Sequence, residues 1–66
     1  MLDEMFIRKI AREVMAKHAA ENGGRNGMTR LEVIEAVIAM NGDLDDVRAV
    51  MAEGVRQLMP GRVELS

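Results

Sequence analysis

Few side chains in this 66-residue sequence could take part in a chemical reaction. Cysteine, tyrosine and tryptophan are absent, and the only hydroxyl groups belong to Thr29 and Ser66. Nucleophilic catalysis needs an activated hydroxyl, thiol or amine beside a base. The single histidine, His18, falls on a predicted helix face with apolar residues, which favours a partly buried or helix-terminal role over a catalytic one. We therefore expect no catalytic residues and no enzymatic activity.

Acidic residues come close together at two places in the sequence. Asp43, Asp45 and Asp46 lack the glycine, the later glutamate and the spacing of an EF-hand loop, so helix capping explains them better. Glu32 and Glu35 could form a carboxylate pair for acid-base chemistry, but without a cleft to desolvate them we interpret them as a solvated strip. The sequence therefore predicts no metal ion and no cofactor.

Size and composition indicate one small domain, residues 1–66, with a single core. The absence of cysteine fits a reducing compartment. No apolar run approaches the roughly 20 residues that span a bilayer, and the N-terminus lacks the apolar region of a signal peptide. We therefore expect a cytoplasmic protein that does not enter a membrane.

Apolar periodicity predicts an all-α fold, a compact three-helix domain with helices at about 3–20, 30–40 and 44–59 and a short extended C-terminal arm. The glycine-rich segment 21–27 ends the first helix, and it lacks the Lys-Ser/Thr ending of a phosphate-binding loop. The apolar arc of the first helix contains Phe6, Ile7, Ile10, Ala11, Val14 and His18.

The second helix has the clearest start signal. Thr29 and Glu32 have the spacing of a capping box, while Met28 and Val33 occupy the positions of a hydrophobic staple. The helix is apolar almost all round, which predicts that it is the buried centre of the fold.

Asp43 should be the N-cap of the third helix, directly after Asn41-Gly42 has ended the second in a left-handed cap. Gly54 lies near the middle of the apolar arc and predicts a close helix crossing. Pro60-Gly61 then breaks the helix. The alternating residues 62–66 could pair with a second copy, pack as an arm, or fray.

A chain without catalytic groups is expected to bind another protein, as an adaptor, regulator or inhibitor. Methionine suits adaptable contact surfaces, and seven are present. Met5 and Met59 lie at the edges of apolar arcs, and Arg8 and Arg12 add positive charge on the first helix. We predict these four residues as the protein-binding site. A homodimer that covers surplus apolar surface is also expected.

The alternative is a helix-turn-helix DNA-binding regulator. The second and third helices and the turn Met40-Asn41-Gly42-Asp43 have suitable lengths. Asp45 and Asp46 would then face phosphates, where DNA readers normally carry basic groups. The positive residues Arg8, Lys9 and Arg12 are instead on the first helix. Nucleic acid is therefore ranked below protein as the partner.

The stretch 27–51 contains Gly-Met-Thr-Arg followed by Glu-Ala-Val-Ile-Ala-Met-Asn-Gly-Asp, and it resembles the second and third helices of ubiquitin-associated domains. Thr29 and Arg30 stand where that family usually has glycine and an aromatic residue, and the first helix is longer here. The resemblance implies compact three-helix packing, and no ligand-binding residues are carried over from it.

Overall fold

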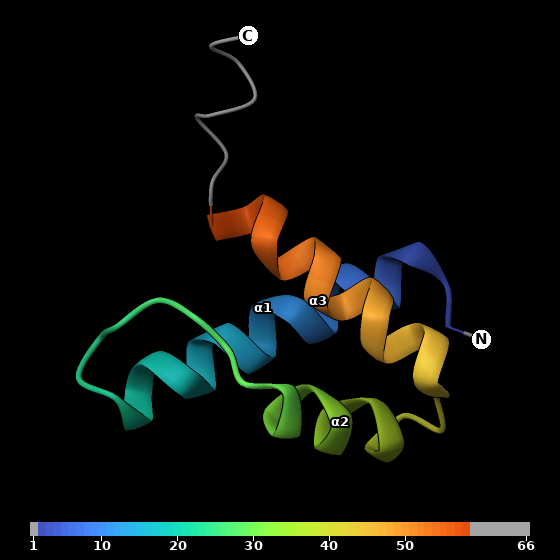
Figure 1. Cartoon of the computed structure of the whole chain (residues 1–66), viewed down its shortest axis with the longest axis horizontal. Helices are drawn as coiled ribbons and strands as arrows, with labels where there is room; N and C mark the ends of the chain where they lie inside the picture. The colour runs from blue at the N-terminus through green and yellow to red at the C-terminus, as the bar shows by residue number, and fades with distance from the viewer. Residues whose placement is uncertain (1, 59–66) are drawn as a thin grey trace, which may run out of the picture.

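The computed structural model describes residues 2–58, and this part of the chain forms three helices. They are α1 (Glu4–Glu21), α2 (Arg30–Ala39) and α3 (Leu44–Leu58). α1 pairs most extensively with α3, and α2 packs against both (Figure 1). The predicted all-α, three-helix fold is confirmed, with helix ends within one residue of those expected. The predicted arm at 62–66 lies outside the described residues.

α1 ends in a turn that depends on glycine. Gly23 and Gly24 have φ angles of 67° and 84°, in the left-handed region that side chains disfavour. The N–H of Gly24 donates to the carbonyl of Ala19 at 2.8 Å, and the side-chain amide of Asn22 donates to the carbonyl of His18 at 2.8 Å. These bonds satisfy carbonyls that the helix end would otherwise leave without partners.

α2 is capped at both ends, as predicted. The Thr29 hydroxyl accepts from the N–H of Glu32 at 3.2 Å, and the Glu32 carboxylate accepts from the N–H of Thr29 at 2.7 Å. At the other end Asn41 has a φ of 61°, and the N–H of Gly42 donates to the carbonyl of Val37 at 2.9 Å. Gly42 supplies room, because a Cβ there would lie 2.7 Å from Cγ1 of Val37.

A second reciprocal cap begins α3. Oδ1 of Asp43 accepts from the N–H groups of Asp45 at 3.1 Å and Asp46 at 3.2 Å. Oδ2 of Asp46 accepts from the N–H of Asp43, and its Oδ1 accepts from the N–H of Leu2, both at 2.9 Å. Asp46, in the first turn of α3, is only 1% exposed. The Asp46 carboxylate therefore links the segment before α1 to the start of α3 through hydrogen bonds.

The core lies between the three helices and is made of aliphatic side chains. Its buried members are Ile7, Ile10, Ala11, Val14, Val33, Val37, Val47 and Val50. α1 supplies four of these residues, and α2 and α3 supply two each. No helix within residues 2–58 is long and apolar enough to cross a membrane.

The prediction that α2 is buried on nearly every side is wrong. Only Val33 and Val37 are buried, whereas Leu31 and Ile38 are each 64% exposed. The physical reason is that α2 lies across one side of the α1–α3 pair and contacts it through a single stripe. Phe6, expected in the core, is also at the surface with 41% exposure.

Gly54 makes room for a side chain and not for a helix crossing, which corrects the sequence-based interpretation. A Cβ at this position would lie 2.9 Å from Sδ of Met28 and closer still to its Cε. Met28 belongs to the segment before α2 and packs against the core. Its flexible thioether fills the space that the glycine leaves, so this contact joins the segment before α2 to α3.

Candidate functional site

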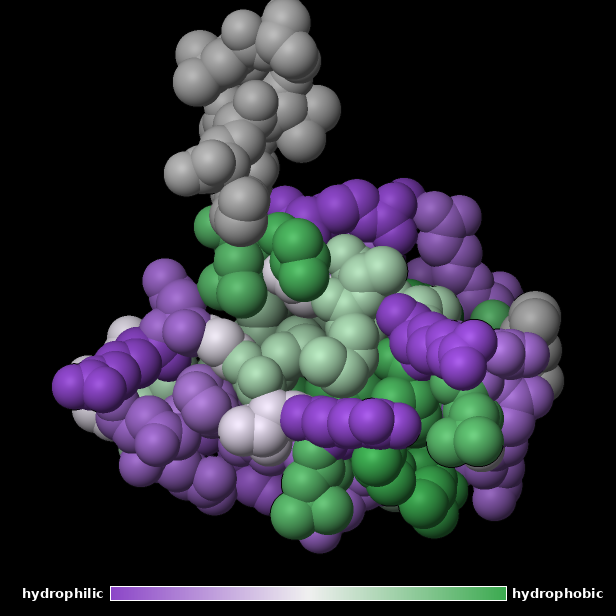
Figure 2. All heavy atoms as spheres, in the orientation of Figure 1, coloured by the Kyte–Doolittle hydropathy of each residue, from purple (hydrophilic) through white to green (hydrophobic). Residues whose placement is uncertain are grey.

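Apolar side chains gather on one surface formed by α2 and α3, which is green in the space-filling view (Figure 2). Leu44 is 70% exposed, Leu31 and Ile38 are each 64% exposed, and Val55 is 58% exposed. We call this surface the α2–α3 face and define it by Leu31, Ile34, Ile38, Leu44, Val47, Met51 and Val55. Clustered apolar exposure of this kind marks interaction surfaces, whereas scattered single residues do not.

Helical spacing builds the α2–α3 face. On α2 the residues at 31, 34 and 38 follow one another at intervals of three and four, and so do those at 44, 47, 51 and 55 on α3. Residues with this spacing form one stripe along a helix. The short connection between Ala39 and Leu44 keeps the two helices adjacent, and they pack against each other. The two stripes therefore merge into one surface.

Two hollows run along the α2–α3 face and share Leu44 and Val47. The first, of about 320 Å³, is lined in addition by Ile34, Val37, Ile38, Gly42 and Asp43. The second, of about 440 Å³, is lined in addition by Arg30, Arg48 and Met51. Because they share residues, we treat them as one groove with an apolar floor, two arginines and a single acid.

The two arginines of the groove are available for new contacts. Arg30 and Arg48 are exposed, and neither forms a salt bridge with another residue of the described range 2–58. Arg8 and Arg56 differ in this respect, since Arg8 pairs with Glu4 at 2.8 Å and Arg56 with Glu53 at 3.3 Å. The groove therefore combines apolar area with uncompensated positive charge.

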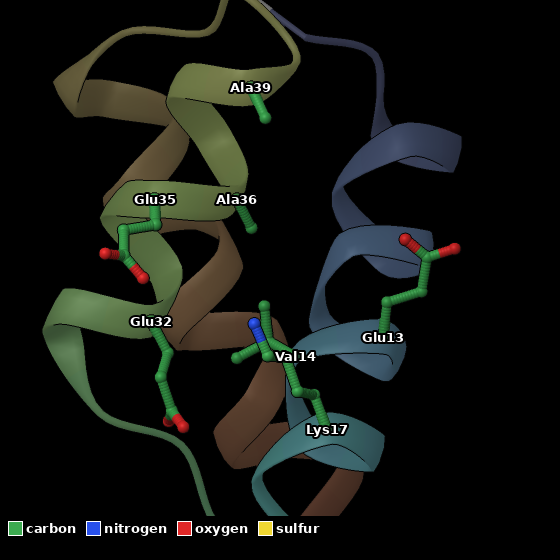
Figure 3. A pocket seen from close by; sticks show the side chains of 7 residues that line it. All are labelled: Glu13, Val14, Lys17, Glu32, Glu35, Ala36 and Ala39. Carbon is green, nitrogen blue, oxygen red and sulfur yellow. The ribbon is translucent and has the colours of Figure 1, made fainter.

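A separate hollow of about 320 Å³ lies between α1 and α2. It is lined by Glu13, Val14, Lys17, Glu32, Glu35, Ala36 and Ala39. Lys17 reaches from α1 toward α2, while Glu35 points away from α1 (Figure 3). Three carboxylates and a lysine could in principle bind a cation or transfer protons, so the hydrogen bonds of these groups decide what the hollow can do.

Glu32 is already engaged in structural hydrogen bonds. Its Oε1 accepts from the N–H of Thr29, and Nδ1 of His18 lies 2.9 Å from Oε1 and 3.1 Å from Oε2. A carboxylate can only accept, so Nδ1 carries the shared hydrogen. The backbone N–H of Thr29 is the main cause that lowers the pKa of Glu32, and His18 adds to it, against the opposing effect of burial. These bonds stabilise the charged form and explain Glu32 as a helix cap.

The sequence interpretation of Glu32 and Glu35 is thus corrected for one of the two. The Glu32 side chain is 21% exposed and bonded, whereas Glu35 is exposed, as expected for a solvated strip. No group of three or more histidine, aspartate or glutamate residues in the range 2–58 is arranged to hold a metal ion. The His18–Glu32 pair could not be predicted from local spacing, because 14 residues separate its members.

The predicted binding residues lie on α1 as far as the structure describes them. Met5 is 76% exposed, Arg12 is exposed, and Arg8 is exposed but paired with Glu4. These three residues share one side of the helix, while Met59 lies outside the described residues. The end of α3 adjoins the second half of α1, where a hollow is lined by Met15, Ala16, Ala19, Asn26, Gln57 and Leu58. The role of the four predicted residues in protein binding stays a prediction.

The helix-turn-helix alternative places α3 in a DNA groove. On α3, Leu44 and Val55 are exposed, and so are the basic residues Arg48 and Arg56. Arg56 is already paired with Glu53. Asp45 is exposed in its first turn, and the carboxylate of Asp46 is used inside the protein. DNA-binding surfaces are rich in basic and amide groups that contact phosphates. The surface chemistry of α3 therefore differs from that of a recognition helix.

Comparison with known proteins gives no relative from which a function could be transferred. No family model matches the chain, and neither the curated proteins nor the solved structures contain a significant match.

Proposed function

We propose that the chain is a non-enzymatic, cytoplasmic protein-binding domain, a small adaptor, regulator or inhibitor, and that the α2–α3 face is its binding surface. One observation carries the proposal: four large apolar side chains of this face are more than half exposed. Each Å² of apolar surface removed from water contributes about 25 cal/mol, so a partner that covers the face gains stability from it. The adjacent groove gives the partner a shape to fit.

The α1 residues Met5, Arg8 and Arg12 form the second candidate surface. It has one exposed methionine and Arg12, while Arg8 is engaged by Glu4. The α2–α3 face is favoured over it because binding energy concentrates in apolar anchors that fill a pocket, and rim charges contribute less. Substitutions on the two surfaces therefore separate the two candidates.

The experiment compares capture of partner proteins by the native chain with capture by two variants, under native expression in the source cells. Ile38→Glu places a charge on the α2–α3 face, and Met5→Glu makes the same kind of change on α1. Both sites are more than half exposed, so both variants should fold. Loss of a stoichiometric partner with Ile38→Glu alone supports the proposal. Loss of that partner with Met5→Glu alone would mean that the binding site is on α1.

DNA binding is tested with the same proteins. Duplex binding that is selective for sequence at physiological salt, and that falls steeply as salt is raised, would replace the proposed function with the helix-turn-helix alternative. Arg48→Glu should strongly weaken such binding, since Arg48 is an exposed basic residue of α3 that forms no salt bridge within residues 2–58.

A further inference from the structure

We infer which class of partner the α2–α3 groove binds, and this inference rests on the proposed function. The partner is an amphipathic helix of another protein, and this helix carries carboxylates beside its apolar stripe. Three features of the described residues support this choice. They are the shape of the groove, the absence of the features that other peptide conformations require, and the charge of the groove wall.

The shape of the groove suits a helix. It runs between two helices, and α3, with 15 residues, is about 22 Å long at 1.5 Å per residue. Two helices side by side leave a trough with apolar walls, into which a third helix places residues at intervals of three and four. Ile38 on α2 and Leu44 on α3 line the groove and are exposed to receive it. Leu31 and Val55 are exposed on the same α2–α3 face beside the groove.

Other peptide conformations lack their usual recognition features here. A partner strand needs a free sheet edge, and residues 2–58 contain no strand. A polyproline segment needs an aromatic groove, but the only aromatic residue of the chain is Phe6, which lies on α1. Among the common modes of peptide recognition, the helix in a groove is the one that this surface fits.

The charge of the groove selects an acidic partner. Arg30 and Arg48 line the same hollow, and the only acid along the whole groove, Asp43, lines the other hollow. Carboxylates at the edge of a partner's apolar stripe would meet the arginines, while lysines there would be repelled. The arginines therefore determine which amphipathic helix is accepted.

A second copy of this chain fits the same groove less well. In a symmetric dimer the same face is used twice, so Arg30 and Arg48 of both copies would be brought into one interface. Only Asp43 lines the groove as a compensating acid. Like charges brought together at an interface oppose association, which favours an acidic partner over self-association.

The test uses two designed peptides of about 18 residues, long enough for several helical turns. Both carry leucines at intervals of three and four, one with glutamates and the other with lysines beside the leucine stripe. Binding is measured by titration calorimetry, and the contact surface is mapped by amide NMR shifts of the labelled protein. We expect the glutamate peptide to bind roughly tenfold or more tightly than the lysine peptide.

Variants make the test specific. Ile38→Glu should abolish binding, and Arg30→Glu combined with Arg48→Glu should reverse the preference toward the lysine peptide. A matched control, Lys9→Glu with Arg25→Glu, makes the same change of charge at exposed residues away from the groove and should leave the preference unaltered. Circular dichroism confirms that each variant keeps its helices.

Three results would overturn the inference: equal affinity for both peptides, binding of neither, or a dimer in sedimentation that Ile38→Glu dissociates. Binding of neither peptide removes the helical partner class, but the proposed function survives if Ile38→Glu still loses a captured protein. If capture is insensitive to Ile38→Glu, the proposed binding surface itself fails.

Discussion

Nδ1 of His18, in the last turn of α1, lies 2.9 Å from Oε1 of Glu32, the carboxylate that closes the capping box of α2. The histidine side chain is 17% exposed, and the glutamate side chain is 21% exposed. The chain between the two helices is glycine-rich and lies mostly at the surface. This pair is therefore a direct polar link between the end of α1 and the beginning of α2.

Removing the histidine should loosen this link. His18→Ala is expected to lower the thermal midpoint by roughly 4 to 8 °C, the shift that loss of one ordinary hydrogen bond gives in a domain this small. Lys17→Ala, at the exposed neighbouring position, is the control and should change the midpoint little. In a Glu32→Ala background, the His18 replacement should have a smaller effect. Equal effects in both backgrounds would show that the pair is not coupled.

Acid should destabilise the domain through two carboxylates. The hydrogen bond from the backbone N–H of Thr29 is the main cause that lowers the pKa of Glu32. The hydrogen bond from the backbone N–H of Asp43 is the main cause that lowers the pKa of Asp46. Each carboxylate thus binds its proton less readily in the folded chain than in the unfolded chain. The unfolded chain therefore takes up protons first as the pH falls, and this favours unfolding. The stability that each charged carboxylate contributes is fully present above its ordinary pKa and is lost as the pH falls toward its lowered pKa in the folded chain. The thermal midpoint should fall progressively from about pH 5 to about pH 3.

Asp46→Asn provides the control for the acid dependence. Asparagine keeps one acceptor oxygen but cannot titrate, and Asp46 accepts from both Leu2 and Asp43. The variant should melt at a lower temperature at pH 5 and show a shallower decline toward pH 3. A decline as steep as that of the native chain would mean that other groups cause the acid sensitivity.

Gly54 and Met28 should be coupled in stability. Alanine stabilises a helix interior by about 1 kcal/mol relative to glycine. In the native chain, however, the Cβ that Gly54→Ala adds would displace the Met28 thioether. The displacement should offset most of the gain, since a flexible side chain can move at the expense of some burial. In a Met28→Ala background that conflict disappears, and Gly54→Ala should then stabilise by about 1 kcal/mol. Urea denaturation of the native chain, the two single variants and the double variant gives the free energy of unfolding of each. Additive effects of the two substitutions would rule out the coupling.

Local signals explain why the helices could be predicted from the sequence. Thr29 with Glu32, Asn41 with Gly42, and Asp43 are caps whose hydrogen bonds involve residues only a few positions apart. Such interactions form wherever the segment lies in the fold, so spacing alone identifies them. The apolar stripe of α1 was predicted for a similar reason, although Phe6 at its margin is exposed.

Tertiary relationships could not be predicted in the same way. α2 is apolar on most sides, so its sequence does not specify whether Val37 or Ile38 faces the core, and packing against α1 and α3 decides this. The contact of Met28 with Gly54 likewise depends on how a loop crosses a helix. The α2 part of the α2–α3 face was consequently predicted to be buried. The binding site was predicted instead on α1 and at Met59.

Truncation should destabilise the domain at Val37 but hardly at its neighbour Ile38. Val37 has 0% exposure and Ile38 has 64%, although both are β-branched residues of the same helix turn. Val37→Ala removes buried atoms and should destabilise the domain by about 2 kcal/mol, whereas Ile38→Ala should stay within about 0.5 kcal/mol. Urea denaturation at low and high protein concentration measures both. A large loss for Ile38→Ala that appears only at high concentration would mean that a second copy covers this residue, and the α2–α3 face would then be a dimer interface.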